Sequence, residues 1–108
     1  MNVVDRPAIG RWTVLAVSGR IDADSADVLE KACMASAKAG SDLLAIDLAE
    51  VTFVTSAGLR VFVTVRKALE TTRGQLVLLR PQVYVRRTLE LSGFASILRI
   101  LDDPEELV

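Results

Sequence analysis

The sequence predicts a single α/β domain over residues 1–108, with a mixed, mostly parallel sheet of four to five strands, an N-terminal hairpin and helices packed against the sheet. A chain of 108 residues can bury one hydrophobic core without disulfides or structural metal. Short apolar runs, of which residues 43–48 are the clearest, indicate strands covered on both faces. Segments with apolar residues at helical spacing alternate with these runs, which is typical of parallel strands joined by right-handed crossovers.

The first two strands are predicted to form a hairpin. Residues 3–6 are expected to pair with residues 12–18 across the connection 8–11. Pro7 would then lie in or beside the turn, where its missing N–H does least harm. Both alternating sets of side chains in the second strand are largely apolar, as expected for a central strand covered on two faces.

A helix is predicted after a connection at residues 19–22. Asp24 is the expected N-cap, Asp27 adds a negative charge in the first turn, and Gly40 is expected to end the helix. The residues expected on its apolar face are Val28, Leu29, Ala32, Cys33, Ala35, Ser36 and Ala39.

The middle of the chain is predicted to be a strand, a short irregular connection and a helix. The strand covers residues 43–48, and the helix begins near Ser56 and ends before Gly74. Its buried face is expected to hold Val61, Phe62, Val65, Ala68 and Leu69, and its outer face Arg60, Thr64, Lys67 and Thr71.

The last part of the chain is predicted to contain a strand at residues 75–79, a helix, and a short strand or extended cover at residues 97–101. Pro81 is expected in the first turn of that helix and Gly93 at its end. The remaining expectations for this region are a buried stripe of Val85, Leu89 and Ser92, an outer pair of Arg86 with Glu90, and a frayed terminal helix over residues 102–107.

Composition and charge argue against several classes of partner. The net charge is −1 and charged residues make up 25% of the chain, so no uniform field attracts nucleic acid, and no nucleic acid partner is expected. No apolar run approaches the ~20 residues that cross a bilayer, and the N-terminus lacks the layout of a signal peptide. We therefore expect no membrane insertion and a cytoplasmic location. The single Cys33 leaves no internal disulfide and is expected to be buried and inert.

Enzymatic sites find little support in the residue types. The chain has no histidine, which excludes Ser-His-Asp and Cys-His sites within one chain and a His-containing zinc site. No Gly-x-Gly-x-x-Gly and no Gly-Lys-Ser/Thr phosphate loop is present, so no cofactor is expected. Residues 54–58 also lack the first glycine of a nucleophile elbow. A serine-dependent hydrolase is therefore the least favoured class of function.

Ser56 is the candidate functional residue, because it lies where a strand passes into a helix. N–H groups in a first helical turn lack intrahelical partners and the helix dipole is positive there, so a phosphoryl group on this serine would find donors and a favourable field. The plainer interpretation of a serine at such a junction is an N-cap. Thr55 can cap equally well, and Ser56 would then point to solvent. The small neighbours Ala57 and Gly58 leave space for a partner to approach.

Three segments resemble one known family. Residues 47–61 resemble the signature of the STAS-superfamily anti-sigma factor antagonists, in which a strand ending in Asp leads through an apolar connection to a serine-containing turn that opens a helix. Residues 17–22 are similar to the family's Gly-x-Leu-Asp loop, and residues 86–94 resemble its late helix and the Gly-hydrophobe pair that follows. The resemblance covers nearly the whole chain.

The resemblance implies a regulatory binding module that is a substrate and not an enzyme. In that family the unmodified antagonist binds an anti-sigma factor that is also a protein serine kinase, and a sigma factor is released. The kinase then phosphorylates the serine that matches Ser56, and a serine phosphatase resets the switch. The partner-binding residues implied around this turn are Asp22, Thr55, Ala57, Gly58, Leu59 and Arg60.

Thr55 departs from the family pattern, because many relatives carry Asp immediately before the modified serine. Either the kinase accepts a different motif, or Thr55 is the acceptor, or the site is not modified. Ser56 is favoured, because a residue inside the first turn projects its hydroxyl more openly than a capping residue. The alternative function is a non-phosphorylated STAS interaction subunit of another regulatory or lipid-transport complex.

Other charged residues have a functional and a plain structural interpretation. Asp22 is either part of the partner's docking rim or a solvated loop acid near a helix start. Asp47 is expected to fix the connection after its strand by hydrogen bonds. Arg60 and Lys67 either contact an acidic partner or are solvated. A small basic cluster is expected to be solvated or paired with Glu90, and comprises Arg80, Arg86 and Arg87.

Overall fold

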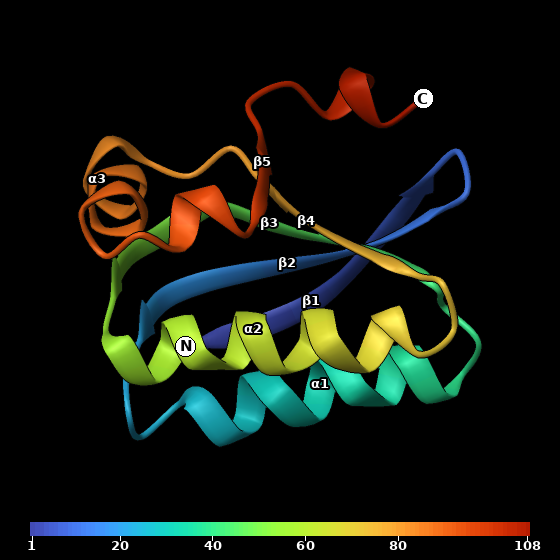
Figure 1. Ribbon diagram of the computed structural model, residues 1–108, viewed down its shortest axis with the longest axis horizontal. Helices are drawn as coiled ribbons and strands as arrows, with labels where there is room; N and C mark the ends of the chain where they lie inside the picture. Colours follow the sequence, from blue (N-terminus) through green and yellow to red (C-terminus); the bar gives the residue numbers. More distant parts are fainter.

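The computed structural model describes residues 1–108 and contains one five-stranded sheet with helices packed against it (Figure 1). The strand order is β1-β2-β3-β4-β5, comprising β1 (Asn2–Ile9), β2 (Trp12–Ile21), β3 (Leu43–Val54), β4 (Gln75–Leu79) and β5 (Arg99–Leu101). Strands β1 and β2 are antiparallel, and every other neighbouring pair is parallel. The predicted mixed, mostly parallel sheet with an N-terminal hairpin is confirmed.

The helices form two groups (Figure 1). They are α1 (Ala26–Lys38), α2 (Ser56–Glu70) and α3 (Val83–Leu91), with short 3-10 helices η1 (Phe94–Ser96) and η2 (Pro104–Leu107). Helices α1 and α2 run side by side and cover one face, whereas α3 and η1 lie at the end of the molecule where β3 finishes. No helix is long and apolar enough to span a membrane.

Two clusters of buried residues hold these layers together. The larger cluster joins the sheet to α1 and α2 and contains Leu29, Ile46 and Phe62, each fully buried. The smaller cluster lies around Trp12 on β2 and is closed by Leu107 of η2. Burial on both faces explains why both alternating sets of residues in β2 and β3 are apolar.

The hairpin is longer than predicted. Strand β1 runs to Ile9, so the turn contains only Gly10 and Arg11. Pro7 lies inside β1 and not in the turn, and the register with β2 shifts between Arg6 and Ile9. An edge strand tolerates proline at such an irregularity, because no ladder hydrogen bond is lost there.

Strand β3 replaces the irregular connection that was expected before Ser56, because it continues to Val54. Its register with β2 shifts twice: Ala16 pairs with Asp47 but Ser18 with Glu50, and a second shift follows opposite residues 19–20. Each shift inserts one extra residue into β3, as a β-bulge does. The bulges break the period of two that identifies a strand in sequence, and this is why the segment resembled a connection.

Helix α1 begins one residue later than predicted. Ser25, and not Asp24, occupies the N-cap position, while Asp27 lies in the first turn as expected. The helix ends at Lys38, before Gly40, whose φ of 97° only glycine adopts readily. Leu29 and Cys33 are buried, and burial raises the pKa of the Cys33 thiol to about 12, as expected for an inert thiol. Three residues expected on the buried face are exposed, namely Val28, Ala35 and Ala39.

Helix α3 also differs from the prediction at both ends. Gln82 is its N-cap, so Pro81 precedes the helix and is buried instead of opening it. Val85 and Leu89 are buried as predicted, but Ser92 is the exposed C-cap residue. Gly93 ends the helix with a φ of 84°. The segment after it forms β5 at residues 99–101, and the expected terminal helix is the 3-10 helix η2.

Candidate functional site

The carboxyl ends of β2 and β3 meet at one end of the molecule, because the two strands are parallel neighbours (Figure 1). Ile21 pairs with Val54 at the last position of both strands. The N–H of Thr55 then donates a 2.9 Å hydrogen bond to the carbonyl oxygen of Ile21, and the Thr55 hydroxyl donates a longer one of 3.4 Å to the same atom. The first residues of α2 are therefore fixed to the segment that leads into α1.

Ser56 is the first residue of α2 and its side chain is exposed, as predicted. Thr55 occupies the N-cap position with an extended backbone, but its side chain makes no capping hydrogen bond. The first intrahelical bond runs from Leu59 N–H to the Thr55 carbonyl, at 3.0 Å. The N–H groups of residues 56–58 consequently have no carbonyl partner inside the helix. A hydroxyl here lies on the surface, at the positive end of the helix dipole.

The Ser56 hydroxyl makes no hydrogen bond within the chain. Modification of this exposed hydroxyl would therefore break no hydrogen bond within the chain.

The turn brings only some of the implied partner-binding residues to the surface. Ser56 and Arg60 are exposed, and Thr55 and Ala57 are half-buried. Gly58 and Leu59 are buried, and Leu59 is only 2% exposed, so their side-chain positions face the interior. The expectation that Gly58 leaves space for a partner is wrong: its missing side chain makes room for Ile21 of β2, which lies within the protein.

Asp22 has a local structural role in the turn before α1. Its Oδ1 accepts hydrogen bonds from the N–H groups of Asp24 and Ser25, both at 3.1 Å, and the Ser25 hydroxyl receives the Asp22 N–H at 2.9 Å. The Ser25 N–H in particular lowers the pKa of Asp22 below its ordinary value of 3.8. Asp22 therefore fixes the turn before α1, whereas Ser25 holds the N-cap position that sequence reasoning gave to Asp24. Contact between Asp22 and a partner stays a prediction.

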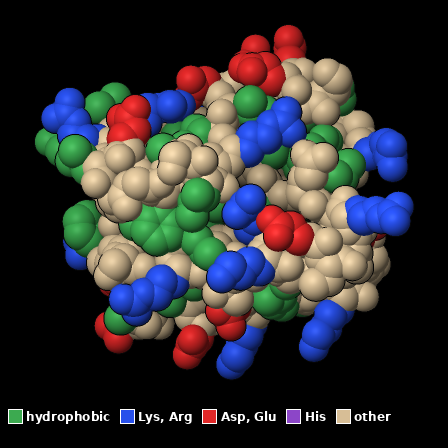
Figure 2. Space-filling model, viewed as in Figure 1, with side chains coloured by type: hydrophobic (Ala, Val, Ile, Leu, Met, Phe, Trp, Pro, Cys, Tyr) green, Lys and Arg blue, Asp and Glu red, His purple; other side chains and the backbone are tan.

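Basic and acidic side chains are interspersed over the face seen in Figure 2, and the basic residues of α2 are Arg60, Arg66 and Lys67. Arg60, Thr64, Lys67 and Thr71 are exposed as predicted. Glu70 is the only acidic residue of the helix, and it pairs with Arg66 at 3.2 Å. Neither Arg60 nor Lys67 forms an ion pair within the chain.

Asp47 fixes the first bulge of β3, as predicted. Its Oδ1 accepts the Ala49 N–H at 3.0 Å, and its carboxylate forms an ion pair with Arg80, which has a left-handed φ of 52°. The Asp47 hydrogen bond raises the pKa of the Arg80 guanidinium. Arg86 pairs with Asp102 and not with Glu90. The expected basic cluster is therefore largely neutralised by acids distant in sequence, which a helix-spacing argument does not reveal.

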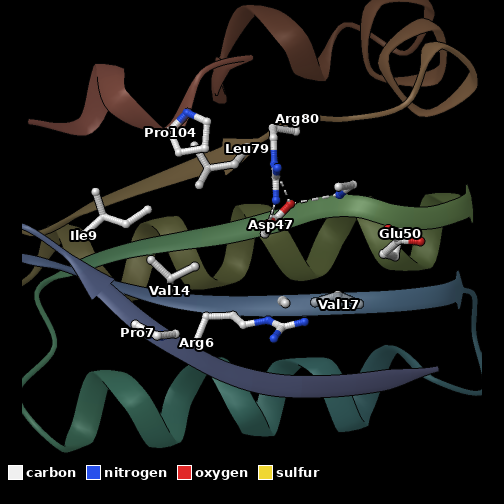
Figure 3. A pocket seen from close by; sticks show the side chains of 12 residues that line it. Arg6, Pro7, Ile9, Val14, Val17, Asp47, Glu50, Leu79, Arg80 and Pro104 are labelled. Carbon is white, nitrogen blue, oxygen red and sulfur yellow. Dashed lines mark hydrogen bonds and ion pairs between the residues drawn. The ribbon is translucent and has the colours of Figure 1, made fainter.

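A cavity of about 300 Å³ lies beside the Asp47–Arg80 pair, on the sheet face opposite α1 and α2 (Figure 3). Arg6 of β1 lines it on one side and Arg80 on the other, with Val14 and Leu79 between them. It lies on a different side of the molecule from Ser56. Two of its charged lining residues, Asp47 and Arg80, form the structural pair just described, and the other two are Arg6 and Glu50.

Sequence reasoning missed three residues near Ser56. Phe53 is 45% exposed, the Arg20 guanidinium carbon lies 4.6 Å from the centre of its ring, and Tyr84 of α3 is 80% exposed. The usable signal was the pattern of α3, where Val83, Tyr84 and Leu91 are apolar although they lie on the face opposite the buried residues Val85 and Leu89.

Comparison with known proteins places this architecture in a family. The STAS domain model matches residues 2–107. BtrV of Bordetella bronchiseptica, assigned as an anti-sigma factor antagonist, is 33% identical over 85% of this chain and 79% of its own length. The anti-sigma-B factor antagonist of Listeria monocytogenes is 34% identical over 78% of this chain and 74% of its own length.

Solved structures show the same fold. The anti-sigma factor antagonist SpoIIAA in its unphosphorylated form has a TM-score of 0.73 at 16% identity, covering 97% of this chain and 92% of its own. The phosphorylated form of SpoIIAA from Bacillus has a TM-score of 0.71 at 16% identity, covering 98% and 96%. With a family model that spans almost its whole length and a relative that is 33% identical over 85% of it, this chain belongs to the STAS domain family.

Proposed function

We propose that this chain is an anti-sigma factor antagonist whose activity is switched at Ser56. The unmodified domain binds an anti-sigma factor that is also a serine kinase, and this binding releases a sigma factor. Phosphorylation of Ser56 ends the binding, and a serine phosphatase restores it. The relatives that are named anti-sigma factor antagonists support the binding of an anti-sigma factor. The solved phosphorylated form of SpoIIAA supports the control of that binding by phosphorylation, since SpoIIAA shares the fold.

The observation that carries this proposal is the position of Ser56. Its hydroxyl is exposed at the first residue of α2 and has no partner inside the chain. A phosphoryl group there would receive N–H groups that have no other partner, so the fold would persist. The change falls on the outer surface, where about two negative charges appear next to Arg60. A loss of ~3 kcal/mol in contact energy would weaken binding more than a hundredfold.

The basic outer face of α2 favours an acidic surface on the partner. Arg60 and Lys67 are exposed and form no ion pair within the chain, and complementary charge raises the rate of association. New negative charge at Ser56 would oppose that attraction. The proposal therefore assigns modification and recognition to one continuous surface.

Intact mass after incubation with a serine-kinase anti-sigma factor and ATP tests the proposal. Wild type is expected to gain one phosphate, Ser56→Ala none, and Thr55→Val one, because Ser56 is the acceptor. Binding of the kinase to unmodified protein, measured in parallel, is expected to disappear after phosphorylation. Unchanged mass together with retained binding would instead favour the non-phosphorylated STAS interaction subunit, for which Thr55 in place of an acid is the supporting observation.

A further inference from the structure

The end of β3 and helix α3 lie at the same end of the molecule as the start of α2 (Figure 1), and both carry exposed apolar side chains. Phe53, three residues before Ser56, is 45% exposed, and Tyr84 on α3 is 80% exposed. A groove of about 320 Å³ lies between the end of β3 and α3, and its lining residues are Thr52, Phe53, Val54, Tyr84, Val85 and Thr88. Exposed aromatic side chains that flank a groove are the usual anchors of protein contacts.

The lining of this groove carries no charged side chain, and the nearest cation that the structure ties to it is Arg20. Arg20 stacks on Phe53 at its edge, its side chain is 64% exposed, and its one ion-pair partner, Asp22, is 4.0 Å away. A guanidinium held over an aromatic ring keeps most of its donors free for a carboxylate. An occupant that matches this groove therefore combines an apolar side chain with a nearby acid.

The charge also argues against a second copy of this chain as the occupant. In a two-fold contact the same patch meets itself, so the contact would hold two Arg20 side chains and no acidic residue from either groove lining. Like charges facing each other at a contact disfavour it. Two residues of the groove lining, Phe53 and Val54, are moreover followed directly in the chain by Thr55 and Ser56.

We propose that this groove, between Phe53 and Tyr84, receives a large apolar side chain of the anti-sigma factor, and that a carboxylate beside that side chain pairs with Arg20. This inference rests on the proposed function, because it names the partner that Ser56 meets. The surface that contacts the partner would then extend from the start of α2 to α3. A phosphoryl group on Ser56 would lie beside the bound apolar side chain.

The groove is tested by measuring the dissociation constant between the kinase that phosphorylates Ser56 and unphosphorylated variants of this protein. Tyr84→Ala and Phe53→Ala are expected to weaken binding at least about tenfold, whereas Tyr84→Phe keeps the ring and binds within about twofold of wild type. Val83→Ala is the matched control, since Val83 is adjacent and 76% exposed but does not line the groove. Arg20→Gln is expected to reduce the salt dependence of the association rate.

The outcomes separate the groove from the switch. Unchanged binding by Tyr84→Ala and Phe53→Ala, with Ser56 still phosphorylated, would overturn the groove and leave the proposed function standing. Equal losses in Val83→Ala and Tyr84→Ala would also overturn it, because they would indicate a general dependence on α3. A wild-type chain that binds no serine-kinase anti-sigma factor would overturn the proposed function itself, together with this choice of partner. Thermal unfolding of each variant verifies that it is folded.

Discussion

The Cβ atom that Gly58 lacks would lie 2.5 Å from Cγ2 of Ile21 and 3.1 Å from the Ile21 carbonyl oxygen. Helix α2 therefore approaches the end of β2 as closely as a residue without a side chain allows. The same carbonyl accepts the hydrogen bond from Thr55 N–H. The placement of Ser56 on the surface thus depends on a close contact two residues further along the helix.

Gly58→Ala is expected to destabilise the fold by about 1–3 kcal/mol, because the added methyl group overfills this contact. Helix propensity alone predicts the opposite sign, since Ala stabilises a helix interior by about 1 kcal/mol relative to Gly. Urea unfolding decides between them, with Ala57→Ser as the adjacent control. Greater stability in Gly58→Ala would show that the contact relaxes easily. A larger substitution, Gly58→Leu, is expected to impair partner binding through this lost packing and not through a lost partner contact.

Ser56→Asp is expected to weaken kinase binding more than about a hundredfold while leaving the melting temperature unchanged or slightly higher. A negative charge in the first turn interacts favourably with the helix dipole, by about 0.3–1 kcal/mol. Ser56→Asn supplies nearly the same size without charge, so it is the control that isolates electrostatics. Calorimetric titration and thermal unfolding are the measurements. A marked drop in melting temperature for both variants would indicate that Ser56 has a structural role.

Arg60 is expected to pair with the phosphoryl group on Ser56. The two positions are four residues apart on α2, and an anion preceding a cation by four residues is the favourable order. The second pKa of the phosphoserine should then lie below its usual value of about 6, and Arg60→Gln should raise it by several tenths. Phosphorus NMR of phosphorylated protein measures this titration. Lys67 lies on the same face about three turns from Ser56, so Lys67→Gln should leave the second pKa of the phosphoserine unchanged.

An unchanged titration in Arg60→Gln would mean that the phosphate does not engage this guanidinium. Pairing, in contrast, has a regulatory consequence. Phosphorylation would both add negative charge and withdraw a cation that faces the partner in the unmodified domain. Both changes make the charge of the surface that faces the partner more negative.

Asp22 is expected to make the fold sensitive to acid. Its pKa in the folded protein is lowered below 3.8, chiefly by the Ser25 N–H, so ionisation favours folding. The stabilisation is present above the unfolded-state pKa and is lost as the pH falls through the lower folded value. Unfolding by urea at pH 7, 4 and 3 should therefore show a steeper loss for wild type than for Asp22→Asn. Asp24→Asn is the control, because the Asp24 carboxylate accepts none of these bonds; an equally steep loss in Asp22→Asn would contradict the expectation.

The sequence predicted those parts of the fold that depend on local pattern. Strand β4 at residues 75–79 and the two faces of α2 were predicted correctly, because an apolar run and a helical period are visible in the chain itself. The bulges of β3 were not, because they arise from pairing with β2. The α1 cap was misplaced by one residue, since Asp22 reaches forward to Ser25 from outside the helix.

The candidate site divides in the same way. The exposure of Ser56 follows from its position at a strand-to-helix junction. The inward position of Gly58 and the groove beside Tyr84 do not, because they depend on contacts with residues about 30 or more positions away along the chain, Ile21 in one case and Phe53 in the other. Periodicity describes which face of an element is apolar, but only the tertiary arrangement shows what that face meets.

A kinase that modifies Ser56 must accept it in a helical conformation. The serine follows Thr55, whose N–H is tied to Ile21, and it begins a helix whose next turn is already buried at Leu59. A short synthetic peptide carrying the same residues would lack that support, since isolated helices of such length hardly form in water. The kinase would therefore recognise the folded start of α2 and not a linear sequence motif. The unfolded chain would not be phosphorylated, although its sequence is unchanged.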